Sequence, residues 1–339
     1  MHLVDPAAYT PPYDRALAAA LVRAGADVEL WTSAFGYGDV PDAPGVRVRE
    51  SFYRWAPSRG RRAARLAQHV PDMLRYARAA RAADVVHFQW LPVQYLDGFL
   101  LPRRPRVLTA HDVLPREPRP GQLAAQRRLY ARMDAVVVHS EHGAARLREL
   151  GAGNVHVIPH GPLDALTHQP EDAPLPPELR RGSPTVLFFG LIRPYKGLDV
   201  LLDAWRRIDR GEARLWVVGM PRMPVTVDAP ATDAALRFVS GPELAATFRA
   251  ADLVVLPYRE IDQSGVLYTA LAFGKPLLLS AVGGFPEVEG AALVPPGDPE
   301  ALAAKLTELL AAPPRPPAAG TSWDEIARRT LDLYAAVQT

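Results

Sequence analysis

Residues 186–205 read VLFFGLIRPYKGLDVLLDAW, and their pattern indicates how the second half of the chain folds. Its first four residues form an apolar run typical of a buried strand, which ends at Gly190. Arg193 and Lys196 follow in a short loop, and the leucine spacing after them predicts a helix buried on one face. In a parallel sheet, the N–H groups at such a helix start lie at the carboxyl edge and bind anions. The pattern predicts a phosphate site, although the two cations could also be solvated loop charges.

Composition limits the class of protein. The chain has 339 residues, which suits two domains, with 48% hydrophobic and 22% charged residues. It contains no cysteine, which excludes disulfides, thiolate metal sites and a cysteine nucleophile. A formal net charge of +2 argues against nucleic acid as a main partner.

The chain lacks an apolar run of the roughly 20 residues that span a bilayer, and its N-terminus does not resemble a signal peptide. We therefore expect a cytoplasmic protein, at most peripheral at the inner face of the membrane. Its charge is uneven, because residues 47–81 are rich in arginine. Such a run is most often a solvated face; the alternative is a surface that contacts anionic lipid or a phosphate-bearing acceptor. The arginines are Arg47, Arg49, Arg54, Arg59, Arg61, Arg62, Arg65, Arg75, Arg78 and Arg81.

Strand-like runs alternate with helical patterns, which predicts an α/β fold with parallel sheets covered by helices on both faces. In the first half, we expect strands at residues 1–4, 28–31, 84–88, 106–110, 135–138 and 155–158, and helices at 15–23, 122–132 and 141–150. In the second half, we expect strands at 185–189, 214–218, 237–239, 253–256 and 276–279, and helices at 198–208, 243–250, 265–273, 299–311 and 322–337. Residues 163–182, rich in Pro, Asp and Glu, predict a linker.

A second element could hold the same anion. Ser264 is a good N-cap for the helix at 265–273, and Gly265, followed by Val266, would let a ligand approach the first free N–H groups. This helix start could hold a diphosphate from the side opposite Arg193 and Lys196. Ser264 could also merely cap its helix.

The spacing from Gly190 to Lys196 and Gly197, followed by an apolar helix, resembles the start of the donor domain in retaining glycosyltransferases of the GT-B fold, which include the family-four enzymes. The resemblance implies that Arg193 and Lys196 hold the diphosphate of a nucleotide sugar. It also implies two Rossmann-like αβα domains that face each other across a cleft. They are an acceptor domain at 1–162 and a donor domain at 183–320, with a C-terminal helix at 321–339 that packs back on the first domain.

The chain departs from the family pattern where relatives carry two glutamates eight positions apart. Ile261 and Thr269 stand at those places, and Glu260 and Asp262 flank the first. A threonine hydroxyl makes one neutral hydrogen bond where a carboxylate accepts two charge-assisted ones, so we expect ribose recognition to be weaker or arranged differently. Thr269, Glu260 and Asp262 remain donor-binding candidates.

Two further segments resemble donor-binding parts of the family. The segment VGGFPEV at 282–288 resembles the loop under the donor sugar, which makes Gly283, Gly284 and Glu287 candidates for contacts with sugar hydroxyls. A tight turn alone would explain the glycines equally well. Phe238 and Val239 lie where the family's base-contacting strand ends.

The first half supplies candidates for the acceptor and the chemistry. His111 and Asp112 end a predicted strand, and His111 resembles the family histidine beside the anomeric carbon. His87 and Gln89 end another predicted strand and could line an acceptor site. Tyr13 closes the segment YTPPY, which stands where many relatives have a glycine-rich loop.

These patterns together predict a metal-independent, retaining hexosyltransferase that moves a sugar from a UDP- or GDP-linked donor to a glycan or lipid-linked hydroxyl. His111, Arg193 and Lys196 are the catalytic candidates. No cofactor and no metal are expected, because the sequence has no Asp-x-Asp motif and protein cations can stabilise the leaving diphosphate. The alternative is a catalytically weak or silent nucleotide-sugar binding protein. A Rossmann oxidoreductase does not fit, because no Gly-x-Gly-x-x-Gly follows the first predicted strand.

Overall fold

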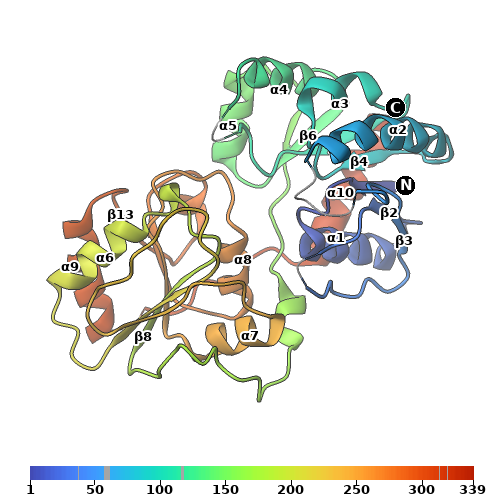
Figure 1. Cartoon of the computed structure of the whole chain (residues 1–339). Coiled ribbons are helices and arrows are strands. Elements are labelled where there is room, and N and C mark those ends of the chain that lie inside the picture. Colours follow the sequence, from blue (N-terminus) through green and yellow to red (C-terminus); the bar gives the residue numbers. More distant parts are fainter. Residues whose placement is uncertain (37, 57–61, 116–117, 313, 319) are drawn as a thin grey trace. The chain divides into compact units, whose positions relative to one another are not determined.

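The computed structural model describes residues 1–36, 38–56, 62–115, 118–312, 314–318 and 320–339 (Figure 1). The chain divides into two compact units. The first unit contains Met1–Gly161 and Thr321–Thr339, and the second contains Pro162–Gly320. No helix in the described ranges is both long and apolar enough to cross a bilayer.

The first unit is built on a sheet of seven strands among its described residues, in the order β3-β2-β1-β4-β5-β6-β7, with every pairing parallel. The strands are β1 (His2–Asp5), β2 (Glu29–Thr32), β3 (Arg47–Glu50), β4 (Val86–Phe88), β5 (Arg106–Thr109), β6 (Ala135–Val138) and β7 (Val155–Val157). The helices are α1 (Pro11–Arg23), α2 (Arg62–Ala79), α3 (Gln94–Leu100), α4 (Gln122–Tyr130), α5 (Glu141–Glu149) and α10 (Trp323–Gln338), with a short 3-10 turn, η1 (Ala80–Ala82).

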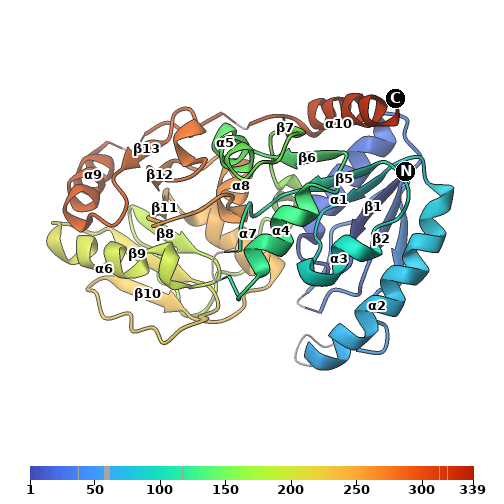
Figure 2. The ribbon, with the colours of Figure 1, turned by 90° about the horizontal axis from the view of Figure 1, so that it is seen from above.

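Helices cover both faces of this sheet, because the central strands β1, β5 and β6 bury apolar side chains on both sides. On one face, α1 and α10 pack against the sheet, and they lie side by side in Figures 1 and 2. On the other face, α2, α4 and α5 contribute Met73, Leu129 and Leu147 to a second core. A Cβ atom on Gly161 would lie 2.5 Å from the Trp323 ring, so α10 presses directly on the chain that leaves β7. The C-terminal helix therefore belongs to the first unit.

The second unit contains a sheet of six strands in the order β10-β9-β8-β11-β12-β13, again parallel. The strands are β8 (Thr185–Phe189), β9 (Arg214–Val218), β10 (Thr232–Ala235), β11 (Leu253–Leu256), β12 (Leu277–Ser280) and β13 (Ala292–Val294). The helices are α6 (Leu198–Arg207), α7 (Gly241–Ala250), α8 (Gly265–Ala272) and α9 (Pro299–Ala311), and 3-10 turns lie at η2 (Asp164–His168), η3 (Pro194–Lys196) and η4 (Phe285–Glu287).

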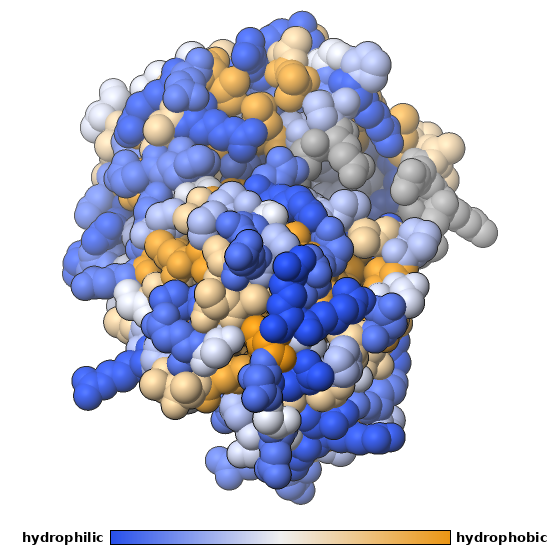
Figure 3. Space-filling model, turned by 90° about the vertical axis from the view of Figure 1, so that its left-hand side faces the viewer, coloured by the Kyte–Doolittle hydropathy of each residue, from blue (hydrophilic) through white to orange (hydrophobic). Residues whose placement is uncertain are grey.

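The strand order of the second sheet reverses between β8 and β11, the position where open α/β sheets bind ligands. One core lies under α6 and α9, and another lies under α7 and α8. Figure 3 views the side on which α6 and α9 lie in Figure 1. Hydrophilic side chains cover most of that face and hydrophobic ones form small patches, as expected for helices whose apolar side is turned inward.

The predicted α/β fold with parallel sheets is confirmed, but several element predictions were wrong. The structure has β3, β13, α2 and α3, which the periodicity did not indicate. Helix α1 begins at Pro11 rather than at residue 15, because proline fits the first turn of a helix, where its N–H is not needed. Residues 237–239 form no strand; the edge strand β10 lies earlier, at Thr232–Ala235, where the sequence TDAA has little apolar character.

The Pro-rich segment that the sequence indicated as a linker lies within the second unit and is packed against its helices. The Arg249 guanidinium of α7 donates hydrogen bonds to the carbonyl oxygens of Thr167, Gln169 and Pro170. η2 also contacts α7 and α8. The Arg249 side chain thus satisfies backbone carbonyl groups of this segment and holds it in place.

Candidate active site

The loop after β8 brings three groups of the second unit together. Gly190 directly follows β8 and has a φ of +114°, which a residue with a side chain rarely adopts. A Cβ atom on Gly190 would lie 2.8 Å from Nζ of Lys196 and 3.0 Å from Cγ2 of Val266. The strand end, the predicted lysine and the start of α8 therefore meet at one point of the carboxyl edge.

The two predicted cations differ in their exposure. Lys196 is only 6% exposed, and its Nζ lies 5.0 Å from the centroid of the Tyr258 ring, whose face attracts a cation. Arg193, at the N-cap of η3, is exposed. Because water screens a buried charge less, Lys196 attracts a nearby anion more strongly than a surface lysine would.

The loop that carries these cations is held by an ion pair that the sequence did not indicate. Arg259, which follows β11, donates to both carboxylate oxygens of Asp199 at 2.8 and 2.6 Å and to the Pro194 carbonyl at 3.0 Å. Its backbone N–H donates to the Tyr195 carbonyl at 2.7 Å. Gly197 completes the contact, because a Cβ atom there would lie 2.0 Å from the Pro257 carbonyl oxygen. The loops after β8 and β11 thus touch through their backbones.

The start of α8 has the predicted cap. The Ser264 side chain accepts a hydrogen bond from the Leu267 N–H, and Gly265 is exposed. Thr269 is 5% exposed, and its hydroxyl donates to the Gly265 carbonyl at 2.8 Å. Since that hydroxyl hydrogen is used within the helix, Thr269 has only a lone pair to offer a ligand.

The loop after β12 contacts the loop after β11 at Gly283. This residue has a φ of +57°, and a Cβ atom there would lie 1.8 Å from the Ile261 carbonyl oxygen, so the contact requires glycine. Gly284 has an ordinary φ of −80°. Glu287 is exposed at the end of η4, and its charge adds to burial in raising the pKa of Tyr268 to about 12.

Four donor-binding candidates of the second unit remain, two of them carboxylates. Glu260 is exposed, whereas Asp262 is buried at 6% exposure. Val239 is buried in the core under α7 and α8, and Phe238 is half exposed; both lie outside any strand. The expectation that both residues end a base-contacting strand was therefore wrong.

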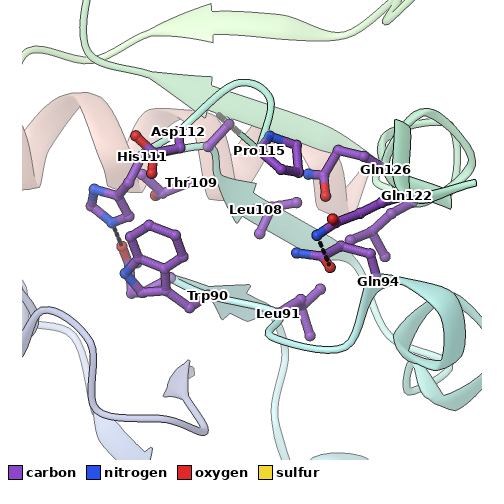
Figure 4. A pocket seen from close by; sticks show the side chains of 13 residues that line it. Trp90, Leu91, Gln94, Leu108, Thr109, His111, Asp112, Pro115, Gln122 and Gln126 are labelled. Carbon is purple, nitrogen blue, oxygen red and sulfur yellow. Dashed lines mark hydrogen bonds between the residues drawn. The ribbon is translucent and has the colours of Figure 1, made fainter. Parts of the chain in front are cut away.

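The first unit has a cavity of about 200 Å³ beyond the carboxyl ends of β4 and β5, between α3 and α4. Figure 4 shows its polar lining. The predicted residues Gln89, His111 and Asp112 line it, together with Gln94, Gln122 and Gln126. The amide groups of Gln94 and Gln122 are 3.2 Å apart and hydrogen bonded. Buried polar atoms without a partner include Nε2 of Gln89 and Oε1 of Gln126.

His111 is held from several sides. The Trp90 ring stacks on it at 5.2 Å between centroids, and the Tyr13 ring meets it edge-on at 4.9 Å. Its Nε2 lies 3.2 Å from Gln89 Oε1, and its Nδ1 lies 3.4 Å from Nε2 of His139. Burial lowers the pKa of His111 well below 6.5, so the ring is neutral at physiological pH.

Two acceptor-site predictions need correction. His87 does not line the cavity: it is 1% exposed, and its ring nitrogens bond Tyr334 Oη at 2.7 Å and Thr109 Oγ1 at 2.8 Å. Tyr13 is 3% exposed and packs against the rings of the histidine cluster rather than into the cavity. Both residues therefore contact side chains that line the cavity, Thr109 and His111, and do not line it themselves.

Sequence reasoning missed the three glutamines on the helices. Gln94 lies on α3, which the sequence pattern did not predict. Gln122 and Gln126 were within a predicted helix, and their spacing of four residues places them on one face. Two amides on one helix face near a strand end would have been a usable signal.

The sequence matches two known family models. The model described as Glycosyltransferase Family 4 matches residues 15–162, and the model described as Glycosyl transferases group 1 matches residues 183–312. A D-inositol 3-phosphate glycosyltransferase of Xylanimonas cellulosilytica is 32% identical, over 94% of this chain and 89% of that one.

Other similarities are more local or more distant. A GDP-mannose:glycolipid 4-beta-D-mannosyltransferase of Xanthomonas campestris pv. campestris is 43% identical over 101 residues, which is 27% of this chain and only 29% of that enzyme. Among solved structures, sucrose-phosphate synthase from Thermosynechococcus elongatus has a TM-score of 0.70 at 21% identity, covering 99% of this chain and 96% of that one. Anabaena Alr3699/HepE in complex with UDP-glucose has a TM-score of 0.68 at 17% identity, covering 99% and 97%. These structures share the fold.

Proposed function

The chain belongs to the group 1 glycosyltransferases of the family-four type and has their GT-B fold, and from this premise we propose that it transfers a sugar from a nucleoside diphosphate sugar to a hydroxyl of a glycan or lipid-linked acceptor. The observation that carries the proposal is the meeting of Gly190, Lys196 and the start of α8 at the β8 edge. This arrangement offers a buried cation beside free helix N–H groups, which is what a diphosphate requires.

The proposed reaction breaks the bond between the anomeric carbon and the diphosphate oxygen and forms a bond from that carbon to the acceptor oxygen. Negative charge develops on the leaving diphosphate, and Lys196 and Arg193 stabilise it, so the proposal needs no metal ion. The departing phosphate oxygen takes the proton of the acceptor hydroxyl, and the anomeric configuration is retained. The retained configuration rests on the family resemblance alone.

The donor is proposed to be UDP- or GDP-linked. A solved structure with the same fold is titled as a complex with UDP-glucose, and a relative is named for GDP-mannose. The exposed Glu260 and the buried Asp262 flank the position where relatives carry the first glutamate, and either carboxylate could accept a hydrogen bond from the donor.

The amide-lined cavity of the first unit is proposed to bind the acceptor. Glutamine amides offer both donors and acceptors without a formal charge, which suits the hydroxyl groups of a neutral sugar or polyol. Asp112 adds a carboxylate to the lining, which suits hydroxyl donors and disfavours an anionic group.

A second candidate function is a nucleotide-sugar binding protein with weak or no turnover. The observation behind it is the Thr269 hydroxyl, which donates to the Gly265 carbonyl instead of to a ligand. In this case the donor would bind at the same loops, but its sugar would not be transferred.

Incubation of the purified chain with UDP-, GDP- and ADP-sugars and a panel of glycans, polyols and glycolipids tests both functions. Release of nucleoside diphosphate that depends on the acceptor would support transfer, whereas binding by calorimetry without release would support the second candidate. Lys196→Met should lower kcat/KM by about 10² to 10³, as for the loss of one oxyanion-stabilising group. Lys305→Met, on α9, is the matched control. Unchanged turnover in Lys196→Met would show that the diphosphate is held elsewhere.

A further inference from the structure

Helix α2 turns apolar side chains outward in the first unit. Ala63, Ala67, Pro71 and Leu74 follow one another at spacings of four and three and are all exposed. Leu66, on the same side of the helix, is 50% exposed, and Leu74 is 44% exposed. Soluble helices normally show the opposite pattern, with their apolar stripe toward the core.

The inward side of the same helix carries polar groups. Gln68, His69 and Asp72 are at most 5% exposed and lie beside the apolar Met73 and Tyr76. Apolar residues therefore lie on both sides of α2, so the sequence has no single apolar stripe that would indicate a helix here.

Hydrogen bonds fix this orientation. Gln68 Oε1 accepts from the N–H groups of Trp55 and Ala56, and an Asp72 oxygen accepts from the Tyr53 N–H at 2.7 Å. His69 bonds the Tyr53 hydroxyl at 2.6 Å through Nδ1 and Asp97 of α3 through Nε2. Rotating α2 to bury its leucines would break these bonds and leave buried polar groups without partners.

The exposed face of α2 also carries positive charge, since Arg78 follows Leu74 by four residues. Arg75 and Arg78 of α2 and Arg54 before it are exposed. The only acid in the sequence of α2 is Asp72, which is buried and paired with Arg75 at 2.6 Å. Arg54 and Arg78 donate to the backbone carbonyls of Glu50 and Leu74 rather than to carboxylates.

Only some arginines of the predicted run at residues 47–81 add uncompensated charge near the exposed face of α2. Arg47 and Arg49 pair with Asp27 and Glu29 at the sheet edge, so their charges are compensated. Arg59 and Arg61 lie outside the described residues. Trp55, directly before α2, is 78% exposed.

We propose that the outward face of α2, with Trp55 and the arginines Arg54 and Arg78, docks the protein on an anionic phospholipid membrane. The helix would lie in the plane of the interface. Leu66 and Leu74 would enter the boundary between headgroups and acyl chains, while the arginine heads stay at the phosphate level. Tryptophan prefers the same depth.

A second copy of the chain fits this face less well than a membrane does. In a twofold pairing, the same arginines of both copies would approach one another, and like charges repel. Anionic headgroups instead complement them. The proposal does not depend on the activity of the protein, because these side chains do not line the cavity of the first unit and the Lys196 loop belongs to the second.

Co-sedimentation of the full chain with phosphatidylcholine vesicles, with and without phosphatidylglycerol, tests the surface. We expect binding to the anionic vesicles that falls steeply with salt concentration. Arg54→Glu and Arg78→Glu should each weaken the partition coefficient by at least about fivefold, since each removed cation near the surface is worth that factor. Arg148→Glu, on the exposed side of α5, is the matched control and should bind as the wild type does.

A second pair of variants tests the apolar contact. Leu66→Asp with Leu74→Asp should abolish binding, whereas Leu123→Asp, at an exposed position of α4, should not. Circular dichroism of each variant checks that it is folded. Lipids brominated on the acyl chain should quench tryptophan fluorescence in the wild type, and Trp55→Phe should remove most of that quenching.

Three results would overturn the proposal. The first is equal binding to vesicles without phosphatidylglycerol, and the second is unchanged binding of the double aspartate variant. The third is a dimer in light scattering that Leu66→Asp with Leu74→Asp converts to a monomer, which would show that a second copy covers this face.

Discussion

Nδ1 of His111 lies 3.4 Å from Nε2 of His139, and this contact decides which nitrogen of His111 carries the proton. His139 donates from Nδ1 to the Ile158 carbonyl at 2.8 Å, and burial lowers its pKa to about 4. A neutral His139 therefore has only a lone pair at Nε2, and His111 must donate to it from Nδ1. Nε2 of His111 is then an acceptor.

This assignment sets the orientation of Gln89. Its amide NH₂ has to face His111 Nε2, because two acceptors would repel, and this also gives the partnerless amide nitrogen a hydrogen bond. The Gln89 oxygen then takes the buried position of the present amide nitrogen. Gln89 is thus a positioning residue for His111 as well as a candidate acceptor contact.

Gln89→Glu should raise the pKa of His111 from its lowered value back toward 6.5 or above. A carboxylate cannot donate to Nε2 and favours the charged imidazolium instead. Titration of the imidazole signals by NMR measures the effect. Gln126→Glu, in the same cavity, is the control. An unchanged His111 pKa in Gln89→Glu would contradict the contact between the side chain of residue 89 and Nε2 of His111.

Gly197→Ala should destabilise the protein by at least about 3 kcal/mol, because the new Cβ atom would lie 2.0 Å from the Pro257 carbonyl oxygen. Gly211→Ala is the matched control. Gly211 has a similarly positive φ of +52° with nothing within 4 Å, so it should lose only the left-handed penalty of about 1 to 2 kcal/mol. Urea unfolding measures both. Equal losses would show that the two loops can move apart at no cost.

Asp14→Asn should stabilise the protein increasingly as the pH rises above about 4. Burial, together with the charge of the neighbouring Asp5, raises the pKa of Asp14 well above 3.8. The folded state then binds more protons than the unfolded one, so this carboxyl's contribution is fully favourable at low pH and is lost as the pH rises. The variant keeps an oxygen to accept the Thr10 hydroxyl bond.

Unfolding free energies of wild type and variant between about pH 4 and pH 8 test this, with a difference in slope of up to about 1.4 kcal/mol per pH unit. The buried histidines, whose pKa values are lowered, have the opposite pH dependence in both proteins and cancel in the difference. Asp84→Asn, at an exposed position, should show no such trend. A constant difference across the range would refute the raised pKa.

Tyr334→Phe should cost about 1 to 3 kcal/mol, because it leaves Nδ1 of the buried His87 without its partner. Helix α10 would then be the first element to loosen, which hydrogen exchange of its amides would reveal. Tyr95→Phe removes a hydrogen bond to the Pro120 carbonyl from a more exposed residue and should cost less. A similar loss in both variants would argue against the His87 bond as a tie between α10 and the sheet.

Local patterns determined much of this protein. The apolar runs ending at Gly190 and at His111 marked strands whose carboxyl ends carry polar side chains, and the alternation with helices predicted two parallel sheets. Ser264 capped its helix as expected, since an N-cap depends on residues only three positions away. The spacing from Gly190 to Lys196 and Gly197 also indicated the family. A loop between a strand and the following helix is a local structure, so its residues can be identified from the sequence.

Long-range packing sets which side chains come together and which helix faces remain exposed. The buried His87 is hydrogen bonded to Tyr334, which lies 247 residues away in the sequence. Arg259, which follows β11, forms an ion pair with Asp199 at the start of α6. The glutamines of the cavity come from two helices and a strand end, and only Gln122 and Gln126, four residues apart on α4, are related by a spacing along the chain. Helix α2 escaped prediction because long-range hydrogen bonds to Tyr53 and Asp97 outweigh the burial of its leucines. These contacts join residues that are distant in sequence, whereas hydrophobic periodicity reflects only residues a few positions apart.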